Sequence, residues 1–291
     1  MYNISTIRHS NKICIIKKDE IIILPYSLEI YLYDMIKSFD YYFNAVVAEQ
    51  SNNILNFTNQ FRIADYSESR NHKIAGFDLF DILCPSLPET LHTTKQYLAF
   101  SQLKHGDVVL DLGAYSGLSS IVFALAVGEQ GKVISVEPDS LNYKCCLENI
   151  ARFKEKTTLD NINLINCAVW NKSQELIFSE EGCLGSHVIS DQRLARVSPP
   201  KRIQGLTLFD LTKHLDKLNF IKCDIEGAEQ YIFDDLLFFQ KFRPSIIIEP
   251  HYTDNGMNTK ECIDILNKYN YTINKIEQPG VSIPLLECTP K

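Results

Sequence analysis

The sequence predicts an α/β fold built on a doubly wound, mostly parallel sheet. From residue 88 onward, short apolar segments of strand length alternate with segments of helical periodicity, which is typical of parallel strands joined by helices. A glycine-containing turn follows the first of these strands. Acidic residues stand at the ends of several strands, where open α/β sheets place their ligand-binding residues.

Each element of this fold has its own segment of sequence. Strands are expected at residues 108–112, 132–136, 162–169, 220–223 and 244–248. Helices are expected at residues 88–103, 118–127, 139–153, 208–215, 228–240 and 259–269. Residues 271–276 and 281–286 surround Pro279-Gly280 and are predicted to form a hairpin, which adds one antiparallel strand. Residues 179–202, rich in glycine and proline, are predicted to form a long loop, a kind of segment that often has a functional role.

The first 75 residues differ from the rest, and residues 76–291 are predicted to form the main domain. Two short strands, at residues 13–16 and 21–24, flank a charged turn, and an aromatic-rich helix follows at residues 27–47. We therefore expect a small N-terminal α+β extension. It is interpreted as a cap or as a dimerisation element that would make a homo-oligomer, with simple packing onto the main domain as the alternative.

Composition limits the classes of function. Apolar residues make up 45% and charged residues 22% of the chain, and the net charge is −7. An acidic surface repels phosphate backbones, so no nucleic-acid partner is expected. No apolar run approaches the ~18 residues that cross a bilayer, and residues 1–12 lack a signal-peptide core, so we expect a cytoplasmic protein without a membrane span. The nine cysteines include no CxxC pair and are expected to be reduced and buried.

The sharpest motif is Asp111-Leu-Gly113-Ala114-Tyr115-Ser-Gly117, which follows a strand and opens a helix. Glycines at such a turn let the backbone bend sharply and approach a ligand closely. The pattern DxGxxxG differs from the dinucleotide pattern GxGxxG and lacks the GK[ST] of nucleoside triphosphate sites. Tyr115 is expected to cover a bound cofactor.

A second acid completes the predicted cofactor site. Glu137, followed by Pro138, ends the next strand, where a carboxylate can accept hydrogen bonds from both hydroxyls of a ribose. Asp111 is placed to meet the ammonium of an amino-acid group, directly or through water. Ala168, after the third strand, would leave room for an adenine ring. One acid for a ribose and one for an amino-acid end, with a glycine turn between them, fit S-adenosylmethionine.

These residues, together with Phe220-Ile-Lys-Cys-Asp-Ile-Glu-Gly-Ala-Glu229 and Glu249-Pro-His251, resemble the FkbM family of methyltransferases. The resemblance covers roughly residues 85–252, and the run from Asp224 to Glu229 is its most specific part. It implies a class I methyltransferase (Rossmann-like) fold and S-adenosylmethionine as the methyl donor. It also implies O-methylation of a hydroxyl on a carbohydrate or secondary metabolite, so the expected partner is a small-molecule or glycan acceptor.

Four residues at neighbouring strand ends are the predicted catalytic group: Asp224, Glu226, Glu249 and His251. A histidine has an unperturbed pKa near ~6.5, so His251 suits a general base that removes the acceptor proton at neutral pH. Asp224 also counts among the cofactor-binding candidates. Glu229 is expected to stabilise the positive end of the following helix. Ser186 and His187 in the predicted long loop are weaker candidates for contact with the acceptor.

Three alternatives stay open at this point. Asp224 and Glu249 match the positions of magnesium ligands in catechol O-methyltransferases, so a divalent metal is possible, although it is not the favoured reading. A nicotinamide-dependent oxidoreductase would use a similar sheet, but the DxGxxxG loop argues against it. A non-catalytic protein that merely binds the cofactor is the third, and the acids at the strand ends argue against that.

Overall fold

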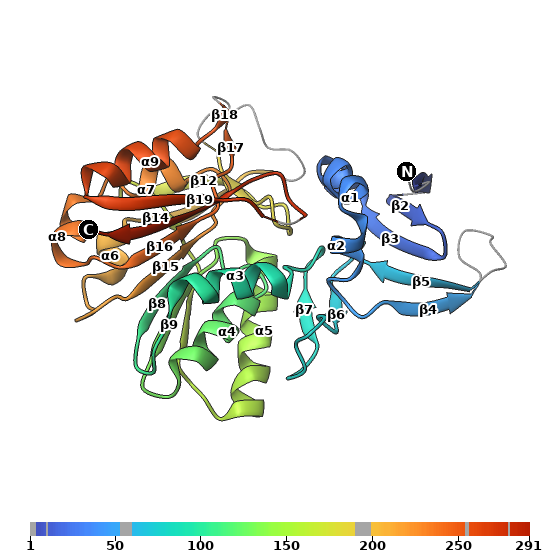
Figure 1. Ribbon diagram of the computed structural model, residues 1–291, viewed down its shortest axis with the longest axis horizontal. Coiled ribbons are helices and arrows are strands. Elements are labelled where there is room, and N and C mark those ends of the chain that lie inside the picture. Colours follow the sequence, from blue (N-terminus) through green and yellow to red (C-terminus); the bar gives the residue numbers. More distant parts are fainter. Residues whose placement is uncertain (1–3, 10, 53–59, 190–198, 254–255, 279) are drawn as a thin grey trace.

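The computed structural model describes residues 4–9, 11–52, 60–189, 199–253, 256–278 and 280–291. A seven-stranded sheet lies at the centre of its larger part (Figure 1). Its strands are arranged in the order β10-β9-β8-β15-β16-β20-β19. Their bounds are β8 (Val108–Leu112), β9 (Lys132–Val136), β10 (Ile162–Ile165), β15 (Phe220–Cys223), β16 (Ser245–Ile248), β19 (Tyr271–Ile276) and β20 (Leu285–Pro290). All neighbouring pairs are parallel except those of β20, which runs antiparallel to β16 and β19. The predicted doubly wound sheet with one antiparallel strand is therefore confirmed.

Helices cover both faces of this sheet because successive strand residues point to opposite sides. On one face, Val109 and Phe220 pack toward α3 (Leu91–Ser101), α4 (Leu118–Val127) and α5 (Ser140–Thr157). On the other, Leu110 and Ile221 pack toward a second set of helices. That set comprises α6 (Leu208–Thr212), α7 (Glu229–Ile232), α8 (Leu236–Lys241) and α9 (Thr259–Lys268). The central strands are buried on both faces, so their sequences read as continuous apolar runs.

Two expectations near the third strand were wrong. The predicted strand at residues 162–169 splits into β10 and β11 (Ala168–Val169), and β11 belongs to another sheet. That four-stranded sheet, in the order β11-β14-β12-β13, also contains β12 (Gln174–Ser179), β13 (His187–Val188) and β14 (Lys201–Leu206). The predicted loop at residues 179–202 thus contains β13 and meets β12 and β14 at its two ends, and residues 190–198 lie outside the described part. The exposed polar residues of β14 gave no apolar signal.

Two further boundaries differ from prediction. The expected helix at residues 228–240 is broken into α7 and α8, because the Asp235 side chain accepts a hydrogen bond from the Phe238 N–H and starts a new helix. The last strand begins at Leu285 rather than at residue 281, since Leu285, Leu286 and Cys288 supply its buried side chains. Pro279 lies outside the described residues.

The N-terminal extension forms its own five-stranded sheet in the order β1-β2-β3-β5-β4. Its strands are β1 (Ile4–His9), β2 (Lys12–Lys17), β3 (Glu20–Pro25), β4 (Glu49–Asn52) and β5 (Gln60–Asp65). The two predicted strands are confirmed as β2 and β3. The predicted single helix at residues 27–47 is instead three short pieces, the 3₁₀ helix η1 (Tyr26–Tyr31), α1 (Leu32–Lys37) and α2 (Phe39–Phe43). Ser38 has a non-helical backbone and separates α1 from α2.

The extension and the main sheet share one hydrophobic core. Ile13 and Phe43 of the extension belong to the same buried cluster as Phe220 of the main sheet. Two short two-stranded pairs complete the strands, β6 (Arg70–His72) with β7 (Ile82–Cys84) and β17 (Tyr252–Thr253) with β18 (Gly256–Met257). All nine cysteines are buried and free, as expected.

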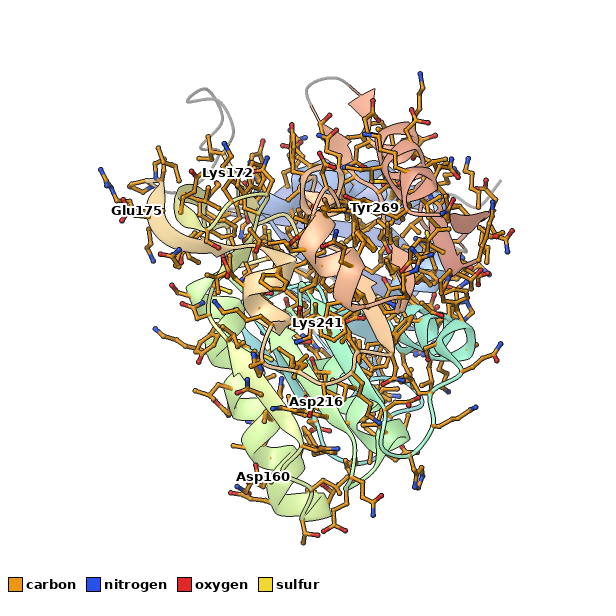
Figure 2. All side chains as sticks on the ribbon, turned by 90° about the vertical axis from the view of Figure 1, so that its left-hand side faces the viewer. Asp160, Lys172, Glu175, Asp216, Lys241 and Tyr269 are labelled. Atoms are coloured by element: carbon orange, nitrogen blue, oxygen red, sulfur yellow. The ribbon has the colours of Figure 1, made fainter. Side chains whose placement is uncertain are left out.

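The surface carries mixed charge. In the side view, the labelled acidic and basic residues Asp160, Asp216, Lys172 and Lys241 lie on the same side of the molecule (Figure 2). None of the helices in the described segments combines the length and the apolarity that a bilayer crossing requires.

Candidate active site

A cavity of about 400 Å³ opens at the carboxyl ends of β8, β9, β15 and β16. This size falls in the range of pockets that bind small molecules. Of the predicted cofactor residues, Gly113, Tyr115, Glu137, Pro138, Ala168 and Asp224 line it. All four predicted catalytic residues line it as well: Asp224, Glu226, Glu249 and His251. The parallel strands therefore bring the acids and the histidine to one opening.

The glycine loop is needed for the contact between two strand ends. Gly113 has φ +77°, and a Cβ there would lie 1.8 Å from the carbonyl oxygen of Asp224. Gly117 has φ +84°, and its Cβ would lie 2.8 Å from Cys146 Sγ. Any side chain at Gly113 would push β8 away from β15 before it reached a ligand. Gly113 itself lines the cavity, and its expected close approach to a cofactor stays a prediction. Gly117 and Ala114 lie behind the wall of the cavity.

Asp111 also lies behind the wall, fully buried. Its Oδ2 accepts hydrogen bonds from Ser119 Oγ at 2.8 Å and from Ser120 Oγ at 2.6 Å. Its Oδ1 lies 3.7 Å from the Nζ of Lys222, a lysine that is 1% exposed. Asp111 therefore holds the first turn of α4 and does not line the cavity. Its Oδ1 has no hydrogen-bond partner among the described residues, and the expected contact with an ammonium group, directly or through water, stays a prediction.

Lys222 links the two central strands of the site. Its Nζ donates to the carbonyl oxygen of Gly113 at 2.7 Å and lies 3.2 Å from Asp224 Oδ2. Burial alone would lower the pKa of this lysine, but the negative charges of Asp224, Asp111 and Glu89 raise it above the usual value. The ammonium is thus charged at neutral pH and neutralises the acids beneath the glycine loop.

Glu137 has the environment expected of a residue that binds sugar hydroxyls. Its Oε2 accepts the N–H of Tyr115 at 2.8 Å, and its Oε1 accepts the N–H of Asp139 at 2.9 Å. Burial raises the pKa of this carboxyl to about 7, and the two backbone N–H groups oppose that rise. A carboxylate has about four lone-pair sites, so acceptor capacity remains on the side that faces the cavity. Pro138 and Ala168 lie beside it in the wall.

His251 is held by a carboxylate from the start of α7. Its Nδ1 donates to Glu229 Oε1 at 2.8 Å. The same oxygen accepts the N–H groups of Ile225 and Gly227, and Asn258 donates to Oε2 at 2.7 Å. These bonds keep Glu229 ionised and fix the imidazole, so that Nε2 faces the cavity acids. Glu229 is expected from the sequence to stabilise the positive end of the following helix. That helix, α7, has four residues, and Glu229 also accepts the hydrogen bond from His251.

Two carboxylates lie beside the Nε2 atom of the imidazole. Nε2 lies 3.3 Å from Glu226 Oε1 and 3.5 Å from Asp224 Oδ1. Burial alone would lower the pKa of His251, but the charges of Glu226, Glu229 and Asp224 raise it well above the usual value. Burial raises the pKa of Glu226 to about 8 and that of Glu249 to about 7. This end of the cavity therefore binds positive charge and protons readily.

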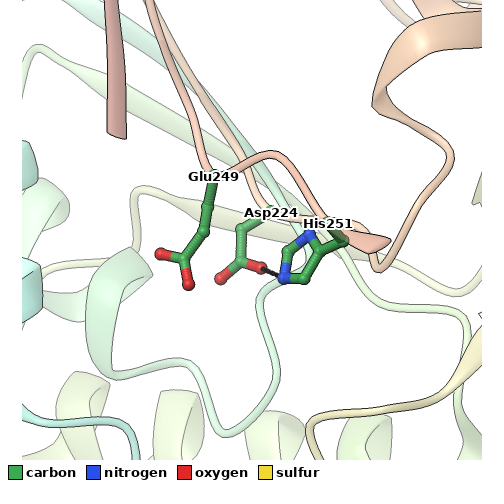
Figure 3. A group of neighbouring side chains, drawn as sticks. All are labelled: Asp224, Glu249 and His251. Carbon is green, nitrogen blue, oxygen red and sulfur yellow. Dashed lines mark ion pairs between the residues drawn. The ribbon is translucent and has the colours of Figure 1, made fainter. Parts of the chain in front are cut away.

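The same group has the composition of a cation site. Asp224, Glu249 and His251 each offer one ligand atom, and these atoms lie within 4.8 Å of one another (Figure 3). Two carboxylates and an imidazole suit a divalent cation, and the hydrogen bond from Nδ1 to Glu229 orients the ring as the outer partners of metal ligands do. Against this, the Lys222 ammonium already pairs with Asp224. The residues fit a metal but do not require one.

The far wall of the cavity comes from the N-terminal extension. Tyr31, Asp34 and Tyr41 line it opposite the strand ends. The Tyr41 hydroxyl bonds to Thr90 at 2.7 Å and to Thr93 at 2.8 Å, and Ser282 donates to Asp34 at 2.9 Å. The extension is thereby joined both to α3 and to the chain ahead of β20. None of the described residues that line the cavity is a lysine or an arginine.

Sequence reasoning missed the roles of Lys222, Glu229 and Glu89, which lines the cavity next to the glycine loop. A signal existed for Lys222, because a lone charged residue inside an apolar strand is rarely buried without a partner. Among the weaker candidates, Ser186 lines the cavity and donates to Asp139, whereas His187 bonds to the carbonyl oxygen of Gly185. Trp170 packs against Tyr231 with ring centroids 4.8 Å apart, as a packing residue does.

Comparison with known proteins identifies the family. Residues 111–273 match the family described as Methyltransferase FkbM domain. Among solved structures, methyltransferase FkbM from Methylobacillus flagellatus is 16% identical over 67% of this chain and 50% of that chain, with a TM-score of 0.46. Precorrin-6y C5,15-methyltransferase from Geobacter metallireducens is 12% identical over 70% of this chain and 90% of that chain, with a TM-score of 0.45. The curated proteins give no match. The family match covers more than half of the sequence, and the chain belongs to the FkbM methyltransferase family, whose methyl donor is S-adenosylmethionine.

Proposed function

We propose that this methyltransferase methylates a hydroxyl group of a carbohydrate or secondary metabolite. The observation that carries the proposal is the Glu229–His251 pair at the edge of the cavity, which presents one imidazole nitrogen to an incoming acceptor. Tyrosine and carboxylate side chains on the surrounding walls are suited to hydrogen bonds with a polyhydroxylated molecule. The lack of lysine and arginine among the described lining residues disfavours phosphate-bearing acceptors.

His251 acts as the general base in this proposal, at a pH above its raised pKa, where Nε2 is deprotonated, and not at neutral pH as the unperturbed value suggested. S-adenosylmethionine supplies an electrophilic methyl group when it is bound. His251 Nε2 accepts the proton of the acceptor hydroxyl, while Glu229 keeps Nδ1 protonated and stabilises the imidazolium that forms. Tyr97 donates to Glu249 Oε2 at 3.0 Å and holds that carboxylate beside the acceptor position. Glu137 would hold the ribose of the cofactor, with Ala168 beside the adenine.

A cation is the second candidate for the same role. Asp224, Glu249 and His251 would hold a divalent ion that orients the acceptor oxygen and lowers its pKa. In that case His251 Nε2 is a ligand and cannot take the proton. The two mechanisms therefore respond differently to chelation.

The test uses S-adenosylmethionine with a ¹³C-labelled methyl group and fractionated small-molecule and oligosaccharide extracts. The carbon chemical shift of the product distinguishes an O-methyl from an N- or C-methyl group. With the acceptor in hand, His251→Ala should lower kcat by about 10²–10⁴-fold and leave the affinity for S-adenosylhomocysteine nearly unchanged. The exposed His214→Ala is the matched control and should behave as wild type.

The pH profile provides a second measure. The base is active when it is deprotonated, and the raised pKa of His251 places the rising limb of kcat/KM above the ordinary histidine range. His251→Ala should lose this limb. Turnover that a chelator abolishes and Mg²⁺ restores would support the cation instead. A product methylated on nitrogen or carbon would refute the proposed acceptor chemistry.

A further inference from the structure

The amino-acid end of S-adenosylmethionine carries an ammonium group that needs an acceptor in the cavity. Lys222 lies beneath the two acceptors nearest the end of β8, and Asp111 Oδ1 is the one of them with no hydrogen-bond partner among the described residues. Asp111 Oδ2 takes two serine hydroxyls, and its Oδ1 lies 3.7 Å from Lys222 Nζ. The carbonyl oxygen of Gly113 takes the Lys222 ammonium at 2.7 Å. Lys222 thus already places a positive charge beside both of these acceptors.

Glu89 is a further acidic residue near the glycine loop. It precedes Thr90, the residue that caps α3, and it lines the cavity together with Gly113 and Asp224. The neighbouring Leu87 carbonyl oxygen accepts the Tyr115 hydroxyl at 2.8 Å, which fixes this segment against the glycine loop. The position of Glu89 is therefore set by the loop that contacts the cofactor.

One oxygen of Glu89 is available for a ligand. Within the described part of the chain, Glu89 accepts one hydrogen bond, from Thr94 Oγ1 to Oε1 at 3.0 Å. Lys222 forms its ion pairs with Asp111 and Asp224, not with Glu89. Burial raises the pKa of Glu89 to about 7, although Lys222 lowers it. A half-buried carboxyl with a free oxygen, in a cavity whose described lining residues include no lysine or arginine, is suited to a cationic ligand group.

We propose that Glu89 binds the α-ammonium group of S-adenosylmethionine and of its product S-adenosylhomocysteine. The ammonium donates to Glu89 Oε2, while Thr94 keeps Oε1 in place. Asp111 instead serves the fold by holding α4 and Lys222. The inference depends on the donor that the proposed function requires, but not on the identity of the acceptor.

Isothermal titration calorimetry tests the inference without an acceptor. Three ligands are compared: S-adenosylhomocysteine, its analogue without the α-amino group, and 5′-methylthioadenosine, which lacks the whole amino-acid end. Glu89→Gln keeps the shape and the Thr94 contact but removes the charge. It should weaken S-adenosylhomocysteine by about 10- to 100-fold, since a hydrogen bond to a charged group is lost. The affinities for the other two ligands should stay within about twofold of wild type.

The matched control is Glu129→Gln, an exposed glutamate that should leave all three affinities unchanged. Proton release adds a readout: S-adenosylhomocysteine binding near pH ~7 should expel a proton from wild-type Glu89, but not from Glu89→Gln. If Glu89→Gln does not fold, Glu89→Asp is used, and the same selective loss is expected.

The outcomes separate this inference from the proposed function. Wild-type affinity of Glu89→Gln for S-adenosylhomocysteine would overturn the inference alone. An equal loss for 5′-methylthioadenosine would overturn it too, because the effect would then be structural. If the wild-type protein bound none of the three ligands, the proposed function would fail along with it.

Discussion

Replacement of Lys222 by methionine tests the electrostatic foundation of the site. The lysine is buried, and its ammonium serves Asp111, Asp224 and the Gly113 carbonyl oxygen at 3.7, 3.2 and 2.7 Å. Methionine fills a similar volume but leaves Asp111 charged and buried without a counterion. Removal of one partner of a buried ion pair costs about 3–5 kcal/mol. The side chain of Asp224 is a quarter exposed, so water screens part of its charge. We therefore expect a cost near the lower end of this range.

Urea unfolding measures this cost. With an m-value of about 3 kcal/mol/M, the midpoint of Lys222→Met should fall by on the order of 1 M. Trp170 fluorescence reports the transition, since this residue is the single tryptophan of the chain. The exposed Lys213→Met, which removes a surface ion pair with Asp210, is the matched control and should change the free energy of unfolding by less than about 1 kcal/mol.

The loss of stability in Lys222→Met should depend on pH. Burial already raises the pKa of Asp111 in the wild-type protein, while Lys222 lowers it. Without the lysine that pKa rises further above the unfolded value, so the folded variant takes up a proton as the pH falls. The difference from wild type should therefore be large near pH ~7.5 and smaller near pH ~5. Equal midpoints for variant and wild type, or a deficit that does not change with pH, would refute the reasoning.

Two further predictions concern the donor site. Glu137→Ala should weaken S-adenosylhomocysteine by about 2–3 kcal/mol, because two ribose hydroxyls lose their acceptor, and calorimetry that gives wild-type affinity would contradict this role. Gly113→Ala should destabilise the cofactor-free protein by about 1–3 kcal/mol more than Gly106→Ala does in thermal or urea unfolding. Both glycines have positive φ, but only at Gly113 would a Cβ meet the backbone of Asp224. Equal effects of the two substitutions would show that backbone strain, not contact, sets the cost.

Much of the fold could be predicted because the signals are local. The strands β8, β9 and β15 are short apolar runs buried on both faces, and the glycine turn and Asp139 mark where helices begin. The small sheet of β11 to β14 escaped prediction because β11 and β13 have two residues each and because β14 is mostly polar and pairs with segments distant in sequence. Gly205 in β14 pairs with both Ala168 and Gln174, and no local pattern encodes that pairing.

Many of the residues that line the candidate site could be predicted, but their contacts could not. Strand order alone brings Asp224 and Glu249 together, because parallel strands end at one edge of the sheet. That Asp111 lies under the loop depends on Lys222, Ser119 and Ser120, whose side chains turn inward. Such partnerships arise from three-dimensional packing. The position of Glu89 likewise follows from the contact of Leu87 with Tyr115, which lie 28 residues apart.

The cavity draws its two sides from different parts of the chain, and this division has an evolutionary consequence. Tyr31, Asp34 and Tyr41 stand outside the matched residues 111–273, whereas Gly113, Glu137 and Asp224 stand inside. Under the proposed function, a substitution on the helices of the extension alters the surface that selects the acceptor and leaves the donor contacts intact. Divergent selection can therefore act on one wall while purifying selection maintains the other, so an ancestral donor site can acquire new acceptors through changes in the extension.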